Sequence, residues 1–199
     1  MTGSRRRPFV LGLTGSIGMG KSTASRIFAE AGCDVWDADA AVHRLYAPGG
    51  AAVAPLAALH PSALVDGGIS RPVLKDWIAA DATALARIER VVHPLVAADR
   101  AAFLDASRAE VAVCDIPLLF ETGAEAGLDA VAVVSAPAAL QRARVLDRPG
   151  MTDAQFEAIL AKQMPDAEKR ARADFIIPSA TIDEARAAID AILARIRAG

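Results

Sequence analysis

One glycine-rich segment restricts the possible folds of this chain more than any other. Gly15-Ser16-Ile17-Gly18-Met19-Gly20-Lys21-Ser22 matches the pattern GxxxxGK[ST] in full. This pattern forms a phosphate loop where it follows a strand and opens a helix. A short apolar run, Phe9–Thr14, precedes it, and a helix-compatible stretch, residues 21–31, follows it. The sequence therefore predicts a strand, a phosphate loop and a helix in that order.

The composition of this loop suits a nucleoside triphosphate with Mg²⁺. Its glycines let backbone N–H groups approach phosphate oxygens, and the helix N-terminus adds positive potential. Lys21 can reach the β- and γ-phosphates, and Ser22 offers a hydroxyl to Mg²⁺. We expect nucleotide contacts from Gly15, Ser16, Ile17, Gly18, Met19, Gly20, Lys21, Ser22 and Thr23. The alternative is a glycine-rich turn that matches by chance, since the pattern fixes only four positions.

Strand and helix patterns alternate along much of the chain. Further strands are expected at residues 33–37, 111–115, 130–134 and 174–177. Thr152 with Gln155 and Thr181 with Glu184 form capping boxes that open two helices. The alternation predicts an α/β fold with a five-stranded, mostly parallel sheet. Together with the phosphate loop, it favours a three-layer fold of the P-loop NTPase type.

Residues 40–108 have a helical pattern almost throughout. Ser70 can cap a helix through Ile78, and Asp81 can cap another through Val92. Pro94 then predicts a break or kink before a third helix that ends near Ser107. We expect a single domain over residues 1–199, with a helical insertion at 40–108.

Charge, cysteine content and hydropathy exclude several classes of protein. The 199 residues carry 22 basic and 24 acidic side chains, a formal charge of −2, which argues against a nucleic-acid-binding surface. Cys33 and Cys114 have no metal-ligand spacing and are expected to be buried thiols.

No apolar run approaches the roughly 18 residues of a membrane span. The cluster Arg5–Arg7 precedes too short an apolar stretch for a secretory signal. We expect a cytoplasmic protein, a monomer or weak homo-oligomer, with a solvated amino-terminal tail.

Carboxylates follow two of the expected strands. Asp37 and Asp39 lie at the end of the second strand, and residues two apart in an extended segment point the same way. Either could accept the proton of an attacking hydroxyl or hold Mg²⁺, and either could instead cap the next helix. Asp115 ends the third strand, where it could be directed at Mg²⁺ or could serve as a turn residue before Pro117.

Three arginines follow the fourth strand. Arg142, Arg144 and Arg148 fall on an expected helix, with Arg144 and Arg148 four residues apart on one face. Guanidinium groups match phosphate oxygens, so closure of this segment over ATP would stabilise the transition state and exclude water. The alternative is a solvated basic face.

The chain resembles the dephospho-CoA kinase family from end to end. The resemblance rests on Gly12–Ser22, on Asp37-Ala38-Asp39, on His93-Pro94 and on Asp115-Ile116-Pro117-Leu118-Leu119-Phe120-Glu121. It implies transfer of the ATP γ-phosphate to the ribose 3′-hydroxyl of dephospho-CoA, the last step of coenzyme A synthesis. Many members carry an asparagine after the fifth strand, whereas this chain has Ile177-Pro178-Ser179.

The resemblance also implies roles for individual residues. Asp39 would be the general base, with Lys21 and Arg144 as further catalytic groups. The helical insertion at 40–108 would bind the acceptor, and Arg144 and Arg148 would belong to a lid region at 141–170. The metal would be held by Ser22, Asp37 and Asp115, and the acceptor by Asp39, His93, Leu118, Phe120 and Glu121. Gln163 matches a glutamine of the family.

Two alternatives remain open at this stage. A kinase for another nucleotide or small alcohol shares the loop, the acids and the lid. A regulatory P-loop protein would hydrolyse ATP slowly, without regard to any acceptor. A guanine-specific switch is disfavoured, because the chain contains no asparagine for the Asn-Lys-x-Asp element.

Overall fold

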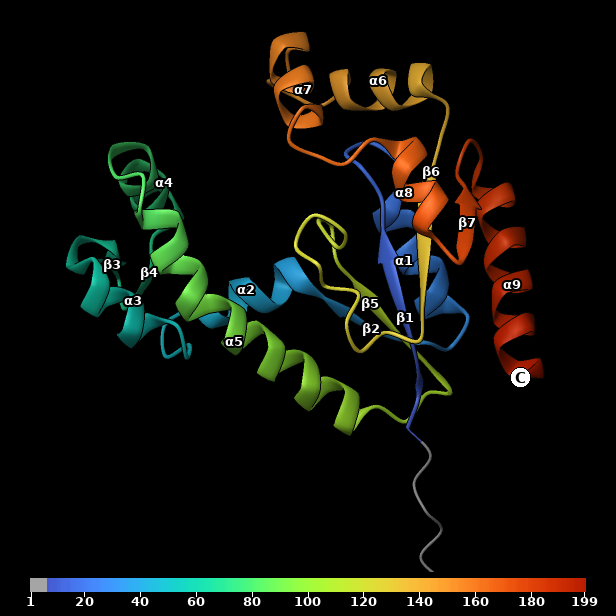
Figure 1. Ribbon diagram of the computed structural model, residues 1–199, viewed down its shortest axis with the longest axis horizontal. Helices are drawn as coiled ribbons and strands as arrows, with labels where there is room; N and C mark the ends of the chain where they lie inside the picture. The colour runs from blue at the N-terminus through green and yellow to red at the C-terminus, as the bar shows by residue number, and fades with distance from the viewer. Residues whose placement is uncertain (1–6) are drawn as a thin grey trace, which may run out of the picture. The chain divides into compact units, whose positions relative to one another are not determined.

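The computed structural model describes residues 7–199 (Figure 1). These residues divide into two compact units, one made of the chain up to Trp36 together with Ser107–Gly199, the other of Asp37–Ala106. Arg5 and Arg6 of the expected tail lie outside the described residues. Arg7 does not belong to a free tail, because its Nη1 donates to Asp129 Oδ2 at 3.0 Å.

A five-stranded sheet forms the centre of the first unit. Its strands are β1 (Phe9–Thr14), β2 (Asp34–Asp37), β5 (Val111–Asp115), β6 (Ala130–Ser135) and β7 (Phe175–Pro178), in the order β2-β5-β1-β6-β7. β1 pairs in parallel with β5 and β6, and β6 pairs in parallel with β7. The expected α/β fold with a five-stranded parallel sheet is confirmed.

Two helices bury an apolar face of this sheet. α1 (Lys21–Glu30) contributes Ala24, Ile27 and Phe28 to the core, and α9 (Ile182–Ala198) contributes Ile189, Ile192 and Leu193. These side chains pack on strand residues such as Leu11, Leu13, Val113 and Val134. Burial of this apolar surface fixes the carboxyl end of β1, and with it the loop that leads into α1.

Three short helices lie between β6 and β7: α6 (Ala138–Leu146), α7 (Asp153–Leu160) and α8 (Asp166–Arg172). Both expected capping boxes are present, Thr152 with Gln155 at α7 and Thr181 with Glu184 at α9. The expectation for Arg148 is wrong, because α6 ends at Leu146 and Arg148 therefore shares no helical face with Arg144. No sequence pattern predicted α8.

The second unit consists mainly of helices around its own core. They are α2 (Ala38–Tyr46), α3 (Val53–Leu59), α4 (Arg71–Ala80) and α5 (Ala84–Ala106), with a 3₁₀ turn, Pro61–Ala63. Ser70 caps α4 as expected, accepting a hydrogen bond from Val73 N–H. The core of the unit includes Leu45, Leu56, Leu74, Ile88 and Val92.

Two expectations for this unit are corrected. β3 (Leu64–Val65) and β4 (Gly68–Ile69) form an antiparallel hairpin within the stretch expected to be helical. α5 also runs without interruption through Pro94, so no break separates two helices there. The helix loses the hydrogen bond that Pro94 cannot donate. Packing of α5 on α2, α3 and α4 holds the helix together around that position.

No helix within residues 7–199 has the length and apolar character needed to cross a membrane.

Candidate active site

The phosphate loop has a left-handed backbone at two glycines. Gly18 has φ +77° and Gly20 has φ +88°, a region that favours glycine. A Cβ on Gly18 would lie 2.5 Å from Val145 Cγ2, so space as well as conformation requires glycine there. No side chain caps the N-terminus of α1, where Gly20 is the cap residue. The first turn of α1 therefore presents its positive end at the loop.

Lys21 and Asp115 form an ion pair next to the loop. Lys21 Nζ contacts Asp115 Oδ1, and the Asp115 side chain is only 3% exposed. Asp115 ends β5 and Lys21 begins α1, so the parallel pairing of β1 with β5 brings the two together. The cation expected to bind phosphates and the carboxylate expected to face Mg²⁺ thus lie side by side.

Arg144 points at the loop from α6. Its Nη2 donates to Ser179 O at 2.7 Å and to Ala180 O at 3.3 Å. Its Nη1 is buried and finds no hydrogen-bond acceptor among the described residues. A Cβ placed on Gly20 would lie 3.7 Å from this nitrogen. A guanidinium held in this way has a free donor beside the loop, as an anionic ligand requires.

Ser179 is fixed to the loop in the place where the family resemblance implied an asparagine. Its Oγ donates to Met19 O at 2.6 Å and lies 3.3 Å from Ser135 O. The hydroxyl is buried, so these contacts are shielded from water. Ser179 therefore holds the phosphate loop through its hydroxyl and Arg144 through its backbone carbonyl.

Two glutamines bind the peptide groups of Ile17. Gln163 Oε1 accepts from Ile17 N–H at 3.1 Å, and Gln141 Nε2 donates to Ile17 O at 2.8 Å. Gln163 lies in the turn between α7 and α8, and Gln141 lies on α6. The family resemblance singled out Gln163, but sequence reasoning missed Gln141, which no motif marks.

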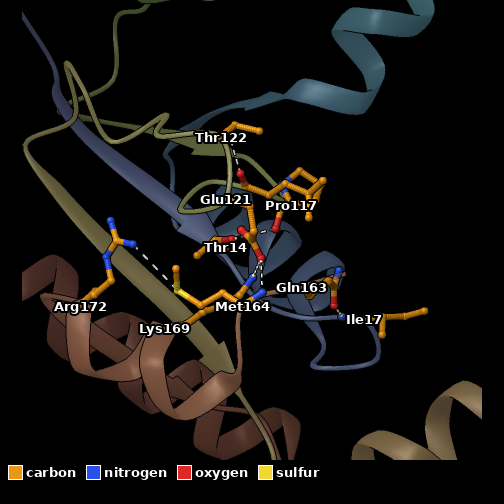
Figure 2. A network of polar contacts seen from close by, with 10 residues as sticks. Thr14, Ile17, Pro117, Glu121, Thr122, Gln163, Met164, Lys169 and Arg172 are labelled. Carbon is orange, nitrogen blue, oxygen red and sulfur yellow. Dashed lines mark hydrogen bonds and ion pairs between the residues drawn. The ribbon is translucent and has the colours of Figure 1, made fainter. Parts of the chain in front are cut away.

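The segment after β5 forms a polar network, which Figure 2 shows. Pro117 O accepts from Thr14 Oγ1 at 3.1 Å. Glu121 Oε1 accepts from Met164 N–H at 2.8 Å and lies 2.8 Å from Lys169 Nζ. Burial alone would raise the pKa of Glu121, but the interactions with Lys169 and Met164 outweigh it and lower the pKa. Glu121 therefore stays ionised.

The neighbours of Glu121 differ in exposure. Leu118 is 42% exposed, whereas Phe120 is buried and its ring lies 4.5 Å below the Arg172 guanidinium. Of these two expected acceptor contacts, Leu118 presents an accessible apolar surface. Sequence reasoning missed Lys169 and Arg172, because nothing in their local sequence indicates a partner in the distant 116–125 segment.

Three expected site residues belong to the second unit. Asp37 caps α2, its carboxylate accepting from Ala40 N–H at 3.0 Å. Asp39 lies in the first turn of α2 and is exposed, without a hydrogen bond to any described side chain or backbone group. The expectation that one extended segment holds both carboxylates is wrong, because Asp37 is the last residue of β2 and Asp39 already belongs to α2. His93 is an exposed residue of α5.

Arg142 and Arg148 make no contact with the phosphate loop. Arg142 forms an ion pair with Asp153 of α7. Arg148 is exposed, and its guanidinium has no partner among residues 7–199. Of the three arginines considered, Arg144 is the one that the fold directs at the loop.

The donor set fits a magnesium ion carried by a nucleotide. Within the described part of the chain no three His, Cys, Asp or Glu residues are grouped as ligands of a metal. Mg²⁺ that bridges phosphates needs only one or two protein ligands, because phosphate oxygens and water complete its octahedron. Ser22, exposed at the start of α1, and Asp115, at the end of β5, supply ligands of the required type.

Comparisons with known proteins agree with this geometry. Residues 9–184 match the family model described as dephospho-CoA kinase. A dephospho-CoA kinase from Cereibacter sphaeroides is 64% identical over 191 residues, which cover 96% of this chain and 97% of the relative. One from Ruegeria pomeroyi is 62% identical, with coverage of 96% and 97%.

A solved structure extends the likeness to three dimensions. A crystal structure from Thermus thermophilus superimposes with a TM-score of 0.84 at 34% identity, covering 96% of this chain and 98% of that one. The overall fold of this chain is therefore shared with an experimentally determined structure.

Proposed function

Because the chain belongs to the dephospho-CoA kinase family, we propose that it transfers the γ-phosphoryl group of ATP to the ribose 3′-hydroxyl of dephospho-CoA. The 3′-oxygen forms a bond to the γ-phosphorus, the bond between that phosphorus and the β,γ-bridging oxygen breaks, and ADP leaves. The hydroxyl proton passes to a carboxylate. The products are coenzyme A and ADP.

The single observation that carries the phosphate-binding part is the orientation of Arg144. Its Nη2 is tied to Ser179 O, while the buried Nη1 has no acceptor among the described residues. A buried donor without a partner is unfavourable, so this geometry suits a site that a phosphate oxygen completes. Lys21 and the backbone N–H groups of Gly15–Thr23 supply the remaining positive potential.

ATP is proposed to enter as its magnesium complex. Ser22 would hold Mg²⁺ through its hydroxyl and Asp115 through its carboxylate. The bound ion would neutralise charge that develops on the phosphate oxygens. Lys21, now paired with Asp115, would then turn its ammonium to the β- and γ-phosphates. Of the three residues expected to bind the metal, Asp37 is the least available as a ligand, because its carboxylate caps α2.

Asp39 is proposed as the general base. Its exposed carboxylate is not engaged by the other described residues, so it is available to accept the proton of the attacking hydroxyl. The carboxylate of Asp37, by contrast, already accepts a hydrogen bond from Ala40 N–H. The assignment rests on the Asp-Ala-Asp element of the family resemblance.

The remaining expected contacts concern the acceptor and the lid. His93, Leu118, Phe120 and Glu121 are proposed to line the acceptor site, and Arg144 and Arg148 to belong to a lid within residues 141–170. The unit Asp37–Ala106 is proposed to act as the acceptor-binding insertion expected at 40–108. We also propose a cytoplasmic enzyme, a monomer or weak homo-oligomer, without nucleic-acid or membrane partners.

The activity is tested by following ADP release from ATP and Mg²⁺ in the presence of single acceptors. Dephospho-CoA should stimulate release strongly, whereas AMP, other nucleotides and pantetheine should not. Equal stimulation by another nucleotide or alcohol would assign a different acceptor. Slow hydrolysis that no acceptor changes would favour an ATP-dependent regulatory protein instead.

A further inference from the structure

Lys169 is a fully buried lysine that faces a single carboxylate. Its side chain is 0% exposed, and its Nζ lies 2.8 Å from Glu121 Oε1. The contact lacks the alignment of a hydrogen bond, and no other described residue accepts one from this ammonium. Lysines are almost never fully buried, because desolvation of the ammonium is costly and one ion pair seldom repays it. Stability alone therefore does not explain Lys169.

Glu121, the partner of Lys169, belongs to a segment anchored on the central sheet. Pro117 O of that segment accepts from Thr14 Oγ1 at 3.1 Å, and Thr122 Oγ1 donates to Leu118 O at 2.7 Å. The same Glu121 oxygen that faces Lys169 also accepts from Met164 N–H at 2.8 Å. One carboxylate oxygen thus joins the segment after β5 to the turn between α7 and α8 (Figure 2).

The residue before Met164 reaches the phosphate loop. Gln163 Oε1 accepts the N–H of Ile17 at 3.1 Å, and Ile17 lies in the middle of the loop. Since Gln163 and Met164 are consecutive, the hydrogen bond of Met164 to Glu121 restricts where the Gln163 side chain can lie. Displacement of Glu121 would therefore move the acceptor that fixes the Ile17 peptide.

We propose that Lys169 is a positioning residue for the phosphate loop, acting through Glu121, Met164 and Gln163. Its positive charge keeps the Glu121 carboxylate ionised and oriented toward Met164 N–H, and Gln163 in turn orients the Ile17 peptide for ATP. Lys169 itself touches no nucleotide, since its side chain has no exposed surface. The inference rests on the proposed function only in taking ATP as the ligand of this loop.

The test is a double-mutant cycle between Lys169→Met and Glu121→Gln, read by the affinity for a non-hydrolysable ATP analogue without acceptor. Lys169→Met leaves Glu121 without its cation, and the affinity should fall about tenfold, the size expected when the charge-assisted hydrogen bond from Met164 N–H to the Glu121 carboxylate is lost. In the double variant the amide that replaces the Glu121 carboxylate still offers an oxygen to Met164 N–H, and no buried charge remains. The affinity of the double variant should return to within about threefold of the wild type.

A pH profile separates positioning from a general loss of stability. In Lys169→Met the burial that raises the Glu121 pKa is no longer opposed by the ion pair. As the pH is lowered from 8 to 5, the affinity for the analogue should therefore decrease more steeply in this variant than in the wild type, since protonation of the analogue's own terminal phosphate affects both proteins equally. All affinities are measured well below the unfolding temperature of the variant.

If Lys169→Met folds poorly, a second variant tests the same chain of contacts, and a third serves as its control. Gln163→Met removes the acceptor of Ile17 N–H and should weaken binding of the analogue about fivefold with little change in Tm. Arg186→Met is the matched control, because Arg186 also pairs with a glutamate, Glu30, at 2.8 Å, but with an exposed side chain. It should leave the affinity unchanged.

These measurements distinguish a positioning role of Lys169 from a merely structural one. An affinity and a pH profile equal to those of the wild type in Lys169→Met, with a lowered Tm, would make Lys169 merely structural and overturn the proposal. A double variant as weak as Lys169→Met would also overturn it, as would an unchanged affinity in Gln163→Met. If the wild type binds the analogue but does not phosphorylate dephospho-CoA, the proposed function fails and this cycle still decides the role of Lys169.

Discussion

Ser179 Oγ donates a hydrogen bond to Met19 O at 2.6 Å, so a residue that follows the last strand supports the phosphate loop near the start of the chain. The backbone carbonyl of Ser179 also accepts from Arg144 Nη2 at 2.7 Å. One residue therefore links the loop to the arginine that points at it. Ser179 thus contributes both its hydroxyl and its backbone carbonyl to this junction.

Ser179→Ala should weaken both the fold and nucleotide binding. The variant leaves the Met19 carbonyl without this buried donor, which costs about 1 to 2 kcal/mol in the free energy of unfolding. ATP affinity should fall about fivefold, because the loop loses a restraint. Denaturant unfolding and calorimetric titration measure the two effects. Ser62→Ala, which removes an exposed hydroxyl 2.9 Å from His60 Nε2, should change neither, and equal effects in both variants would contradict the assignment.

Gly18→Ala should abolish tight ATP binding. The added Cβ would sit 2.5 Å from Val145 Cγ2 and 2.9 Å from Gln141 O, at a φ of +77° that disfavours alanine. The loop must shift to accommodate it, because the carbonyl cannot move away freely. Gly32→Ala is the matched control, since Gly32 has φ +85° but no atom within 4 Å of the new Cβ.

Gly32→Ala should cost about 1 kcal/mol of stability, the strain of a left-handed residue with a side chain, and leave ATP affinity intact. Isothermal titration with ATP and Mg²⁺ compares the two variants. Loss of affinity in both would mean that backbone strain, not the approach to Val145 and Gln141, sets the requirement for glycine at position 18.

Asp34 should make the stability of the fold dependent on pH. Hydrogen bonds from the Ser107 hydroxyl, then from the backbone N–H groups of Ala109 and Arg108, lower the pKa of Asp34 below its usual value of 3.8, against the opposing effect of burial. A depressed pKa in the folded state contributes stability above about pH 4 that is lost as the pH falls through the folded value.

Asp34→Asn should therefore be less stable than the wild type at pH 7, by on the order of 1 kcal/mol. The difference should shrink as the pH falls from 5 to 3. Urea unfolding at several pH values measures it. A difference that does not depend on pH would show that ionisation of Asp34 is not the source of the stabilisation.

Asp39→Asn should lower kcat by at least about 100-fold, the usual contribution of a general base. Asn keeps the size of the side chain but accepts no proton, so the Kd for ATP should remain within about twofold of the wild type. Single-turnover kinetics and equilibrium binding separate the two quantities. Asp76→Asn, on the exposed face of α4, is the control for loss of one carboxylate. Wild-type turnover in Asp39→Asn would remove Asp39 from the mechanism.

Local signals predicted a large part of this fold. The phosphate loop, the strand before it and the two capping boxes depend on residues close in sequence, and they form where the sequence indicated. The β3–β4 hairpin was also detectable. Asp66-Gly67, with φ of 50° and 80°, is a two-residue turn of the kind that hairpins favour.

Other features depend on contacts between distant segments. The pairing of Glu121 with Lys169 and Met164 joins parts of the chain that no local pattern relates. Asp37 and Asp39 lie on either side of the point where β2 ends and α2 begins, so the alternation of side chains in an extended segment does not relate them. Arg148 likewise lies beyond the end of α6, which the local sequence does not mark, so it does not share a helical face with Arg144.

An acceptor that lacks only the reacting group gives the sharpest check of the proposed reaction. Wild-type protein with ATP and Mg²⁺ is given dephospho-CoA or its 3′-deoxy analogue, and phosphorylated product is identified by mass and by ³¹P NMR. We expect coenzyme A, with its new phosphate on the ribose 3′-oxygen, from dephospho-CoA, and no product from the analogue. Phosphorylation of the analogue, or of another position in dephospho-CoA, would contradict the proposed transfer.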